Sequence, residues 1–102
     1  MNINGYELVL TCLACPEQYD VFKDGEQVGY LRLRHGYFYA SIPNYSDEIV
    51  YEAEPKGDGM FESNERMMFL DGAIYAIDNF IRYKLCQYSK KEKKKDEWRN
   101  GE

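Results

Sequence analysis

The clearest pattern in the chain is an alternation of apolar and polar residues through its middle, interrupted twice by glycine. Asp24-Gly25 separates the first two strand-like runs, and His35-Gly36 separates the second run from a third. An Asp-Gly pair between two such runs is typical of a type I′ hairpin turn, which needs a positive φ at both positions. The predicted antiparallel strands lie near residues 18–23, 26–34 and 37–42.

The second turn sets the register of the strands on either side of it. It pairs Arg34 with Tyr37 and Leu33 with Phe38. Because successive side chains of a strand point to opposite faces, the sheet has one apolar face and one polar face. The apolar face, which we expect to form the core, carries Leu31, Leu33, Phe38, Ala40 and Ile42. The opposite face, here named the open face, carries Arg32, Arg34, Tyr37 and Tyr39.

The first turn, Asp24-Gly25, determines which residues of the preceding strand lie on each face. It pairs Lys23 with Glu26, a favourable pair of opposite charges. Gly29 introduces an alternative, because a β-bulge at this residue would break the register. If the register continues unbroken, the open face also carries Tyr19, Val21, Val28 and Tyr30.

Two further strands and one helix complete the predicted fold. The strands lie near 6–11 and 48–53. A helix is predicted over about 63–88, where apolar residues recur at spacings of three and four. We therefore predict an α+β fold, in which an antiparallel meander of about five strands has this long C-terminal helix packed on one face.

Particular residues mark the start and the packing of the helix. Ser63 is a suitable N-cap, and Glu65 in the first turn suits the positive end of the helix dipole. Gly72 lies within the apolar stripe, where glycine costs about 1 kcal/mol relative to alanine. Its presence there indicates close packing of the helix on the sheet.

The composition supports one folded domain in a reducing compartment. The chain has 102 residues, of which 44% are hydrophobic and 16% aromatic, enough for one modest core. No apolar run approaches the roughly 20 residues that span a membrane, and no secretion signal is present at the N-terminus. The three cysteines are an odd number and fit a reducing compartment better than a disulfide framework. We expect a cytoplasmic protein that does not bind membranes.

The charge is unevenly distributed along the chain. Residues 1–79 carry 14 acidic and 5 basic groups, a net −9, whereas residues 80–102 carry 4 acidic and 8 basic groups, a net +4. We therefore expect an acidic domain over 1–88 and a basic, partly frayed tail over 89–102. An acidic body repels nucleic acid over most of its surface.

The open face carries the residue types that favour a binding function. Aromatic and arginine side chains are frequent anchors of protein interfaces. They also stack on the bases of single-stranded nucleic acid, or pair with one another on an ordinary wet sheet face. The acidity of the body favours a protein partner over nucleic acid. The predicted partner-binding residues are Arg32, Arg34, Tyr37, Tyr39, Tyr30 and Tyr19.

Carboxylates are dense in and after the last predicted strand. They lack the Asp-x-Asp-x-Asp-Gly spacing of a calcium loop, so they are typical of a solvated acidic surface. Such a surface on a small body can also mimic the charge of nucleic acid and occupy a basic groove on a nucleic-acid-handling protein, as phage-type anti-defence inhibitors do. The predicted acidic surface comprises Glu48, Glu52, Glu54 and Asp58.

Cys12 and Cys15 have the CxxC spacing of a zinc knuckle or a dithiol redox pair. The strand order brings His35 to the same end of the sheet, where it can serve as a third ligand. A second CxxC is absent from the sequence, and a redox pair belongs at the start of a helix, whereas a strand follows here. We therefore expect structural or incidental cysteines, no metal and no cofactor.

These features favour a small non-enzymatic protein-interaction module or inhibitor that uses its open face and its acidic surface. The alternatives are an acidic nucleic-acid mimic that inhibits a nucleic-acid-handling protein, a module that binds single-stranded nucleic acid through Arg and Tyr, and a zinc or redox protein that uses the CxxC. A monomer or a weak homodimer is expected, because the outer strands have open edges.

Overall fold

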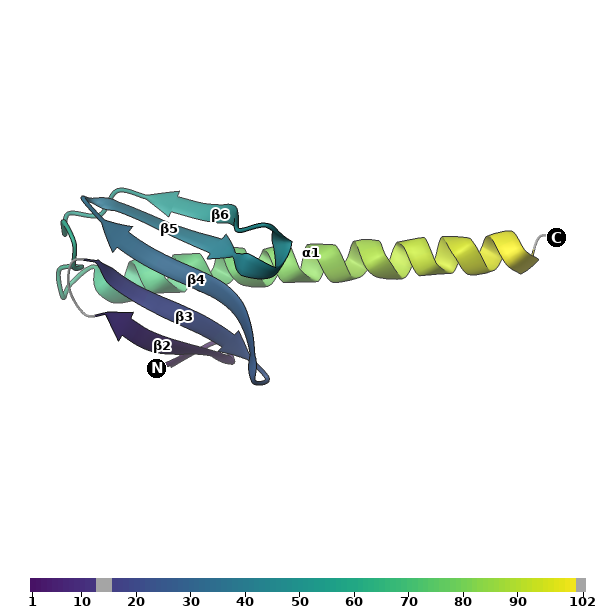
Figure 1. Cartoon of the computed structure of the whole chain (residues 1–102), viewed down its shortest axis with the longest axis horizontal. Coiled ribbons are helices and arrows are strands. Elements are labelled where there is room, and N and C mark those ends of the chain that lie inside the picture. Colours follow the sequence, from purple (N-terminus) through teal and green to yellow (C-terminus); the bar gives the residue numbers. More distant parts are fainter. Residues whose placement is uncertain (13–15, 101–102) are drawn as a thin grey trace.

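A computed structural model describes the backbone of residues 1–12 and 16–100, and the side chains of these residues as far as Lys84. Six antiparallel strands form one sheet in the order of the chain, followed by a long helix (Figure 1). The strands are β1 (Asn2–Ile3), β2 (Tyr6–Cys12), β3 (Glu17–Lys23), β4 (Glu26–Arg34), β5 (Tyr37–Ile42) and β6 (Glu48–Ala53). A short 3₁₀ helix, η1 (Pro43–Tyr45), precedes β6, and the long helix is α1 (Arg66–Asn100).

This meander with one C-terminal helix confirms the predicted α+β fold. The sixth strand, β1, was not predicted. It is joined to β2 by Asn4-Gly5, whose φ angles of 55° and 85° are those of a type I′ turn. Asn-Gly is as strong a turn signal as Asp24-Gly25, but a two-residue strand is too short to show an alternation of its own.

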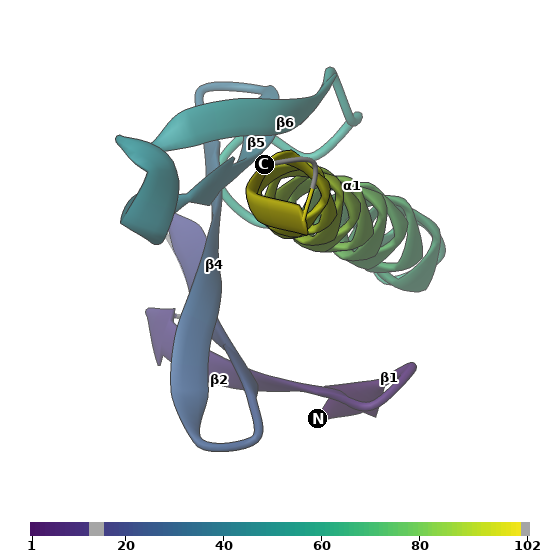
Figure 2. The same ribbon diagram turned by 90° about the vertical axis from the view of Figure 1, so that its right-hand side faces the viewer.

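The molecule has two layers. Figure 2 looks along α1 and shows the helix on one side of the sheet, while no described element covers the other side. The core lies between the layers, and it includes all five residues predicted for the apolar face. No helix in the described part of the chain has an apolar stretch long enough to cross a membrane. The buried apolar residues are Ile3, Tyr6, Leu8, Tyr19, Val21, Leu31, Leu33, Phe38, Ala40, Ile42, Phe61, Leu70, Ala73, Ile74 and Ile77.

The ends of α1 differ from the predicted range. The helix begins at Arg66, and its backbone continues to Asn100, beyond the sheet (Figure 1). The prediction of Ser63 as N-cap was wrong, because residues 63–65 form a turn. The N–H groups of Glu65 and Arg66 both donate to the carbonyl of Glu62 at 3.1 Å, and the first helical bond runs from Phe69 N to the Glu65 carbonyl.

Glycine allows α1 to approach the sheet closely. A Cβ atom at Gly72 would lie 2.6 Å from the Tyr51 hydroxyl oxygen, which confirms that this glycine packs on the sheet. On the sheet side, a Cβ atom at Gly29 would lie 2.7 Å from Cδ1 of Ile77. Both distances are shorter than a non-bonded contact permits, so a larger residue at either position would force the neighbouring side chain to shift.

A β-bulge interrupts the pairing of β3 with β4 at this same glycine. Lys23 pairs with Glu26 next to the turn, as predicted. The register then shifts between Phe22 and Val21, so Val21 pairs with Gly29. Of the two registers that the sequence allowed, the structure therefore adopts the one with a β-bulge at Gly29.

The bulge moves three residues from the predicted open face to the core face. Tyr19 and Val21 are buried, and Val28 packs against the core. Their assignment to the open face was wrong, because one extra residue in a strand inverts the faces beyond it. Tyr30 lies on the other side of the bulge and remains on the open face with Arg32.

A buried ion pair joins the sheet to the start of α1. Glu17, the first residue of β3, is 1% exposed. Its carboxylate accepts hydrogen bonds from Arg66 Nε (2.9 Å), the Phe61 amide (2.9 Å) and the Tyr19 hydroxyl. Burial opposes the charge of Glu17, but Arg66 and the other donors outweigh burial and hold its pKa below the ordinary value. Burial and the nearby Glu17 carboxylate raise the pKa of Tyr19.

Glu17→Gln preserves the shape of this side chain but leaves Arg66 without its partner. We expect the free energy of unfolding at pH 7 to fall by about 3 kcal/mol, the lower end for a broken buried ion pair, because Arg66 keeps 26% of its side chain exposed. Urea denaturation followed by circular dichroism measures the change. The control Asp71→Asn, at an exposed position on α1, should change stability by less than about 0.5 kcal/mol.

The stability of the wild type and that of Glu17→Gln should depend differently on pH at the acidic end. The pKa of Glu17 in the folded chain is below its ordinary value of 4.5, so its stabilising charge is fully present above that pH. This stabilisation is lost as the pH falls through the folded pKa. The deficit of Glu17→Gln should therefore shrink below about pH 4.5, and an equal pH dependence of both proteins would contradict a charged Glu17.

Candidate functional site

The open face is organised by one row of side chains across four strands. Arg32 of β4 lies between Gln18 of β3 and Tyr39 of β5. Tyr39 in turn lies beside Glu52 of β6. The tight turn at His35-Gly36, with φ angles of 54° and 72°, produces the predicted register of β4 and β5 and so confirms the predicted pairing of Arg32 with Tyr39.

Three tyrosines are held together on this face. The rings of Tyr37 and Tyr39 are stacked with centroids 5.7 Å apart, and Tyr30 meets Tyr39 edge-on at 6.3 Å. The Tyr30 hydroxyl donates to Gln18 Oε1 at 3.0 Å, and the Tyr37 hydroxyl donates to Glu52 Oε2 at 2.6 Å. These ring contacts and hydrogen bonds restrict the rotamers of the tyrosines, so the rings form a preorganised surface.

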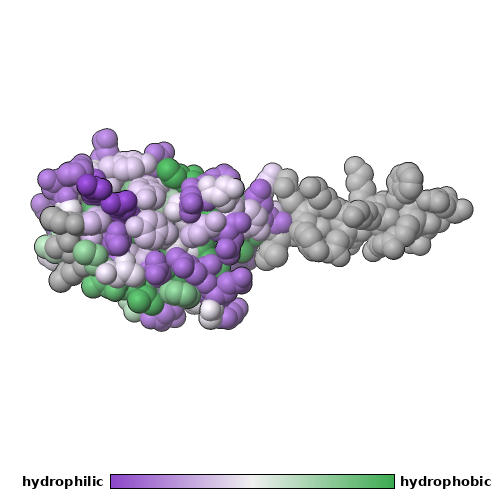
Figure 3. Space-filling model, viewed as in Figure 1, coloured by the Kyte–Doolittle hydropathy of each residue, from purple (hydrophilic) through white to green (hydrophobic). Residues whose placement is uncertain are grey.

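A hollow of about 380 Å³ lies on the open face beside these rings. Figure 3 looks onto this face and shows strongly hydrophilic side chains gathered where β4 ends and β5 begins. Four of the six predicted partner-binding residues line the hollow, Tyr30 lies next to it, and Tyr19 lies on the opposite face of the sheet. The lining residues are Arg32, Arg34, His35, Tyr37 and Tyr39.

The two kinds of side chain in the hollow give it a defined chemistry. The hydrogen bond to Glu52, partial burial and the charge of that carboxylate raise the pKa of Tyr37, so its phenol stays neutral at physiological pH. Burial, followed by the electrostatic interaction with Tyr39, likewise raises the pKa of Tyr30. Arg32 and Arg34 supply guanidinium groups, each of which carries five N–H donors. The hollow therefore combines neutral aromatic walls with cationic donors.

Gln18 belongs to this site but was not predicted. Its side chain holds Tyr30 in place, and its position beside Arg32 follows from the bulge at Gly29. Once the bulge is placed, Gln18 and Tyr30 share the face of Arg32. Gly29 was therefore the sequence signal that could have placed Gln18 on the open face, but only if the bulged register had been chosen.

The four predicted acidic-surface residues are exposed but do not form one site. Glu52 lies on the open face beside Tyr39. Glu48 pairs with Ile42, a core residue, at the other end of β6. Glu54 and Asp58 follow the strand in the loop before α1. Of these four, Glu52 is the one that accepts a hydrogen bond from a residue lining the hollow, Tyr37.

The zinc and redox candidates are only partly described. Cys12 ends β2 and is half-buried, whereas Cys15 lies outside the described residues. His35 is exposed in the β4–β5 turn and adopts a positive φ. Among the described residues, no group of three or more His, Cys, Asp and Glu side chains is arranged to hold a metal ion.

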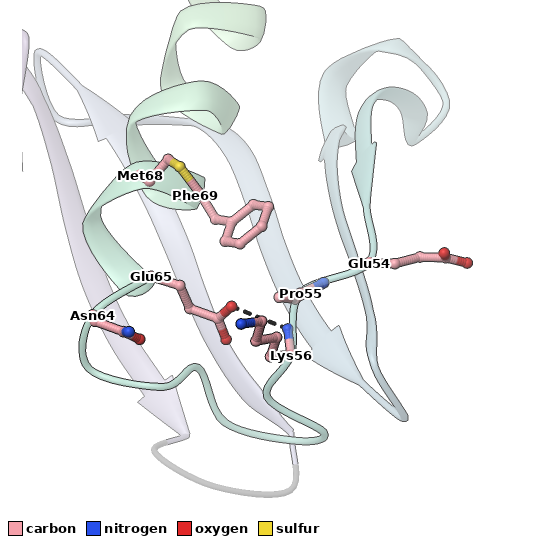
Figure 4. Close-up of a pocket in the computed structure, with 7 residues that line it drawn as sticks. All are labelled: Glu54, Pro55, Lys56, Asn64, Glu65, Met68 and Phe69. Carbon is pink, nitrogen blue, oxygen red and sulfur yellow. Dashed lines mark hydrogen bonds between the residues drawn. The ribbon is translucent and has the colours of Figure 1, made fainter.

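A second hollow, of about 360 Å³, lies beside the start of α1 (Figure 4). The Glu65 carboxylate in its wall accepts hydrogen bonds from the amides of Lys56 (3.0 Å) and Gly57 (2.9 Å). Burial opposes the charge of Glu65, but these donors and the Glu62 amide lower its pKa. This carboxylate therefore holds the loop before α1. The lining residues are Glu54, Pro55, Lys56, Asn64, Glu65, Met68 and Phe69.

Comparisons with protein-family models, with curated proteins and with solved structures found no match to this chain. The functional assignment therefore rests on the geometry of the open face.

Removing the Glu52 carboxylate should lower the pKa of Tyr37 toward its ordinary value of 10.0, because the phenol loses its acceptor and the phenolate loses a neighbouring anion. The variant is Glu52→Ala, and the pKa is measured by NMR titration of ¹³C-labelled tyrosine rings. Glu48→Ala on the same strand is the control and should leave the pKa of Tyr37 unchanged. An unchanged pKa in Glu52→Ala would show that this hydrogen bond does not form in solution.

Gly57→Ala should destabilise the loop before α1. An added Cβ atom would lie 2.0 Å from the Met60 carbonyl oxygen, so the backbone that Glu65 holds must shift. We expect a loss of about 1–3 kcal/mol of unfolding free energy, measured by urea denaturation. Asp58→Ala changes an exposed neighbouring side chain and should cost less than about 0.5 kcal/mol. Equal stabilities of the two variants would show that the loop relaxes freely.

Proposed function

We propose that this chain is a small protein-interaction module, or inhibitor, that binds a partner protein through its open face. The observation that carries the proposal is the hollow lined by Arg32, Arg34, Tyr37 and Tyr39 on a face that no described element covers. Arginine and tyrosine are enriched among the residues that supply most binding energy at protein interfaces. Rings that are already ordered lose little conformational freedom when a partner binds.

An exposed apolar side chain of β2 lies on the same face of the sheet and supports a protein partner. Val9 of β2 pairs with Asp20 on the open face and is 43% exposed. Figure 3 shows hydrophobic side chains gathered near β2, along the lower edge of the face. Protein interfaces commonly combine apolar contacts with aromatic and arginine anchors, so this arrangement suits a folded or extended protein segment.

The Glu52 carboxylate beside the hollow argues against nucleic acid as the partner. Glu52 lies against Tyr37, so a base stacked on this ring would bring its phosphate close to a carboxylate. The net charge of −9 over residues 1–79 adds repulsion at longer range. Nucleic-acid binding gains most of its affinity from phosphate contacts with Lys and Arg, which are few in this part of the chain.

The proposal is tested by capturing partners on the tagged full chain from a nuclease-treated lysate of the source cells. The test variant is Tyr37→Ala/Tyr39→Ala, and the matched control is Tyr75→Ala/Tyr83→Ala, which removes two exposed tyrosines from α1. We expect the wild type and the control to capture the same protein, which mass spectrometry identifies. Calorimetry with that purified protein should show about thirtyfold weaker binding for the test variant.

Two outcomes would contradict this proposal. If the test variant binds the captured protein as tightly as the wild type, the open face is not the binding surface. If instead wild type binds a single-stranded oligonucleotide with an affinity that falls steeply with salt, the nucleic-acid alternative is correct. Circular dichroism of all variants establishes that they are folded.

A further inference from the structure

Arg32, which lines the hollow, has an unsatisfied hydrogen-bond donor. Its Nε atom is shielded from solvent and has no hydrogen-bond acceptor among the residues that the structure describes. Buried polar groups in proteins are almost always hydrogen-bonded, and an unpaired donor that belongs to a charged group is the costliest exception. A group of this kind on a binding face indicates an acceptor that arrives with the partner.

The acceptors that flank Arg32 are already engaged by tyrosines. Gln18, its neighbour on β3, accepts the hydroxyl proton of Tyr30 at 3.0 Å. Glu52, at the far end of the row, accepts the hydroxyl proton of Tyr37 at 2.6 Å. The tyrosines therefore hold these oxygens in place, and Arg32, which lines the hollow, keeps a donor that has no acceptor among the described residues.

We infer that the hollow receives a single carboxylate of the partner protein, which Arg32 and Arg34 bind. This inference rests on the proposed function, since it names the group that the open face recognises. The planar guanidinium fork matches a carboxylate with two parallel hydrogen bonds. Tyr37 and Tyr39 wall the same hollow, and apolar ring surfaces strengthen such a charged pair by excluding water.

A single carboxylate fits the surrounding charges better than a chain of phosphates. Glu52 borders the hollow on the β6 side, and Asp20 lies beside Tyr30 on the β3 side. A carboxylate in the hollow contacts the two guanidinium groups directly, whereas a phosphodiester chain would also have to pass these acidic neighbours. Screening with a length of about 8 Å at physiological salt weakens both repulsions, but the phosphate chain brings several charges past the two carboxylates and the lone carboxylate brings one.

The probe is a pair of peptides that differ only in charge, acetyl-Gly-Glu-Gly-amide and acetyl-Gly-Gln-Gly-amide. Each is titrated into the ¹⁵N-labelled full chain at constant ionic strength, and the Nε–Hε signal of Arg32 is followed by NMR. We expect a saturable downfield shift with the glutamate peptide and none with the glutamine peptide. The absence of a saturable shift with the glutamate peptide would overturn the inference.

Variants test whether binding needs the planar guanidinium of Arg32 or only its positive charge. Arg32→Lys retains the positive charge but loses the planar fork, so the glutamate peptide should bind about tenfold more weakly, as read from backbone amides of β4 and β5. Arg82→Lys on α1 is the matched control and should bind as the wild type does. Equal binding by Arg32→Lys and the wild type would overturn the role of Arg32.

The outcomes also distinguish this inference from the proposed function. If the captured partner requires Tyr37 and Tyr39 but the Arg32 signal does not shift with the glutamate peptide, the open face is still the interaction surface. The inference that the hollow binds a carboxylate is then wrong. If an oligothymidylate shifts the Arg32 signal at a lower concentration than the glutamate peptide does, the hollow recognises phosphate. In that case both the carboxylate and the protein partner are overturned.

Discussion

The buried carboxylate of Glu17 is the contact on which the arrangement of the two layers depends. It brings together the start of β3, the loop before α1 and the first residue of that helix, through Tyr19, Phe61 and Arg66. A buried charge is tolerated only when its hydrogen-bond donors are all in place, so loss of one donor penalises the whole junction. The Glu17 N–H also donates to the Gly59 carbonyl at 2.7 Å, which holds the same loop from the other side.

Because this junction determines where α1 begins, it also determines which face of the sheet the helix covers. Gly29 and Gly72 then allow the layers to approach closely, and the apolar stripe of α1 is buried against the sheet. One helix can cover only one face of the sheet. The opposite face of β4 and β5 is left with Arg32, Tyr37 and Tyr39. The stacked rings of Tyr37 and Tyr39 and the hydrogen bond from Tyr37 to Glu52 order this face without a covering layer.

Local signals account for the parts of the fold that could be predicted. Each two-residue turn sets its register through a positive φ that few residues adopt, and this was enough to place Arg32 beside Tyr39. Tyr19 shows the limit of this reasoning. Its strand alternates as regularly in the wrong register as in the right one, and the bulge that buries it lies where Ile77 of the helix closely approaches Gly29.

The sequence by itself determined the α+β class, the hairpin registers next to the turns, the helical stripe and four residues of the hollow. Tertiary structure decided the bulge, the start of α1, the partners of Glu17 and the engagement of Gln18 and Glu52 by tyrosines. The physical reason is the range of the interactions. Turn geometry and periodicity depend on neighbours along the chain, whereas Glu17 and Arg66 are 49 residues apart and meet only when the helix packs on the sheet.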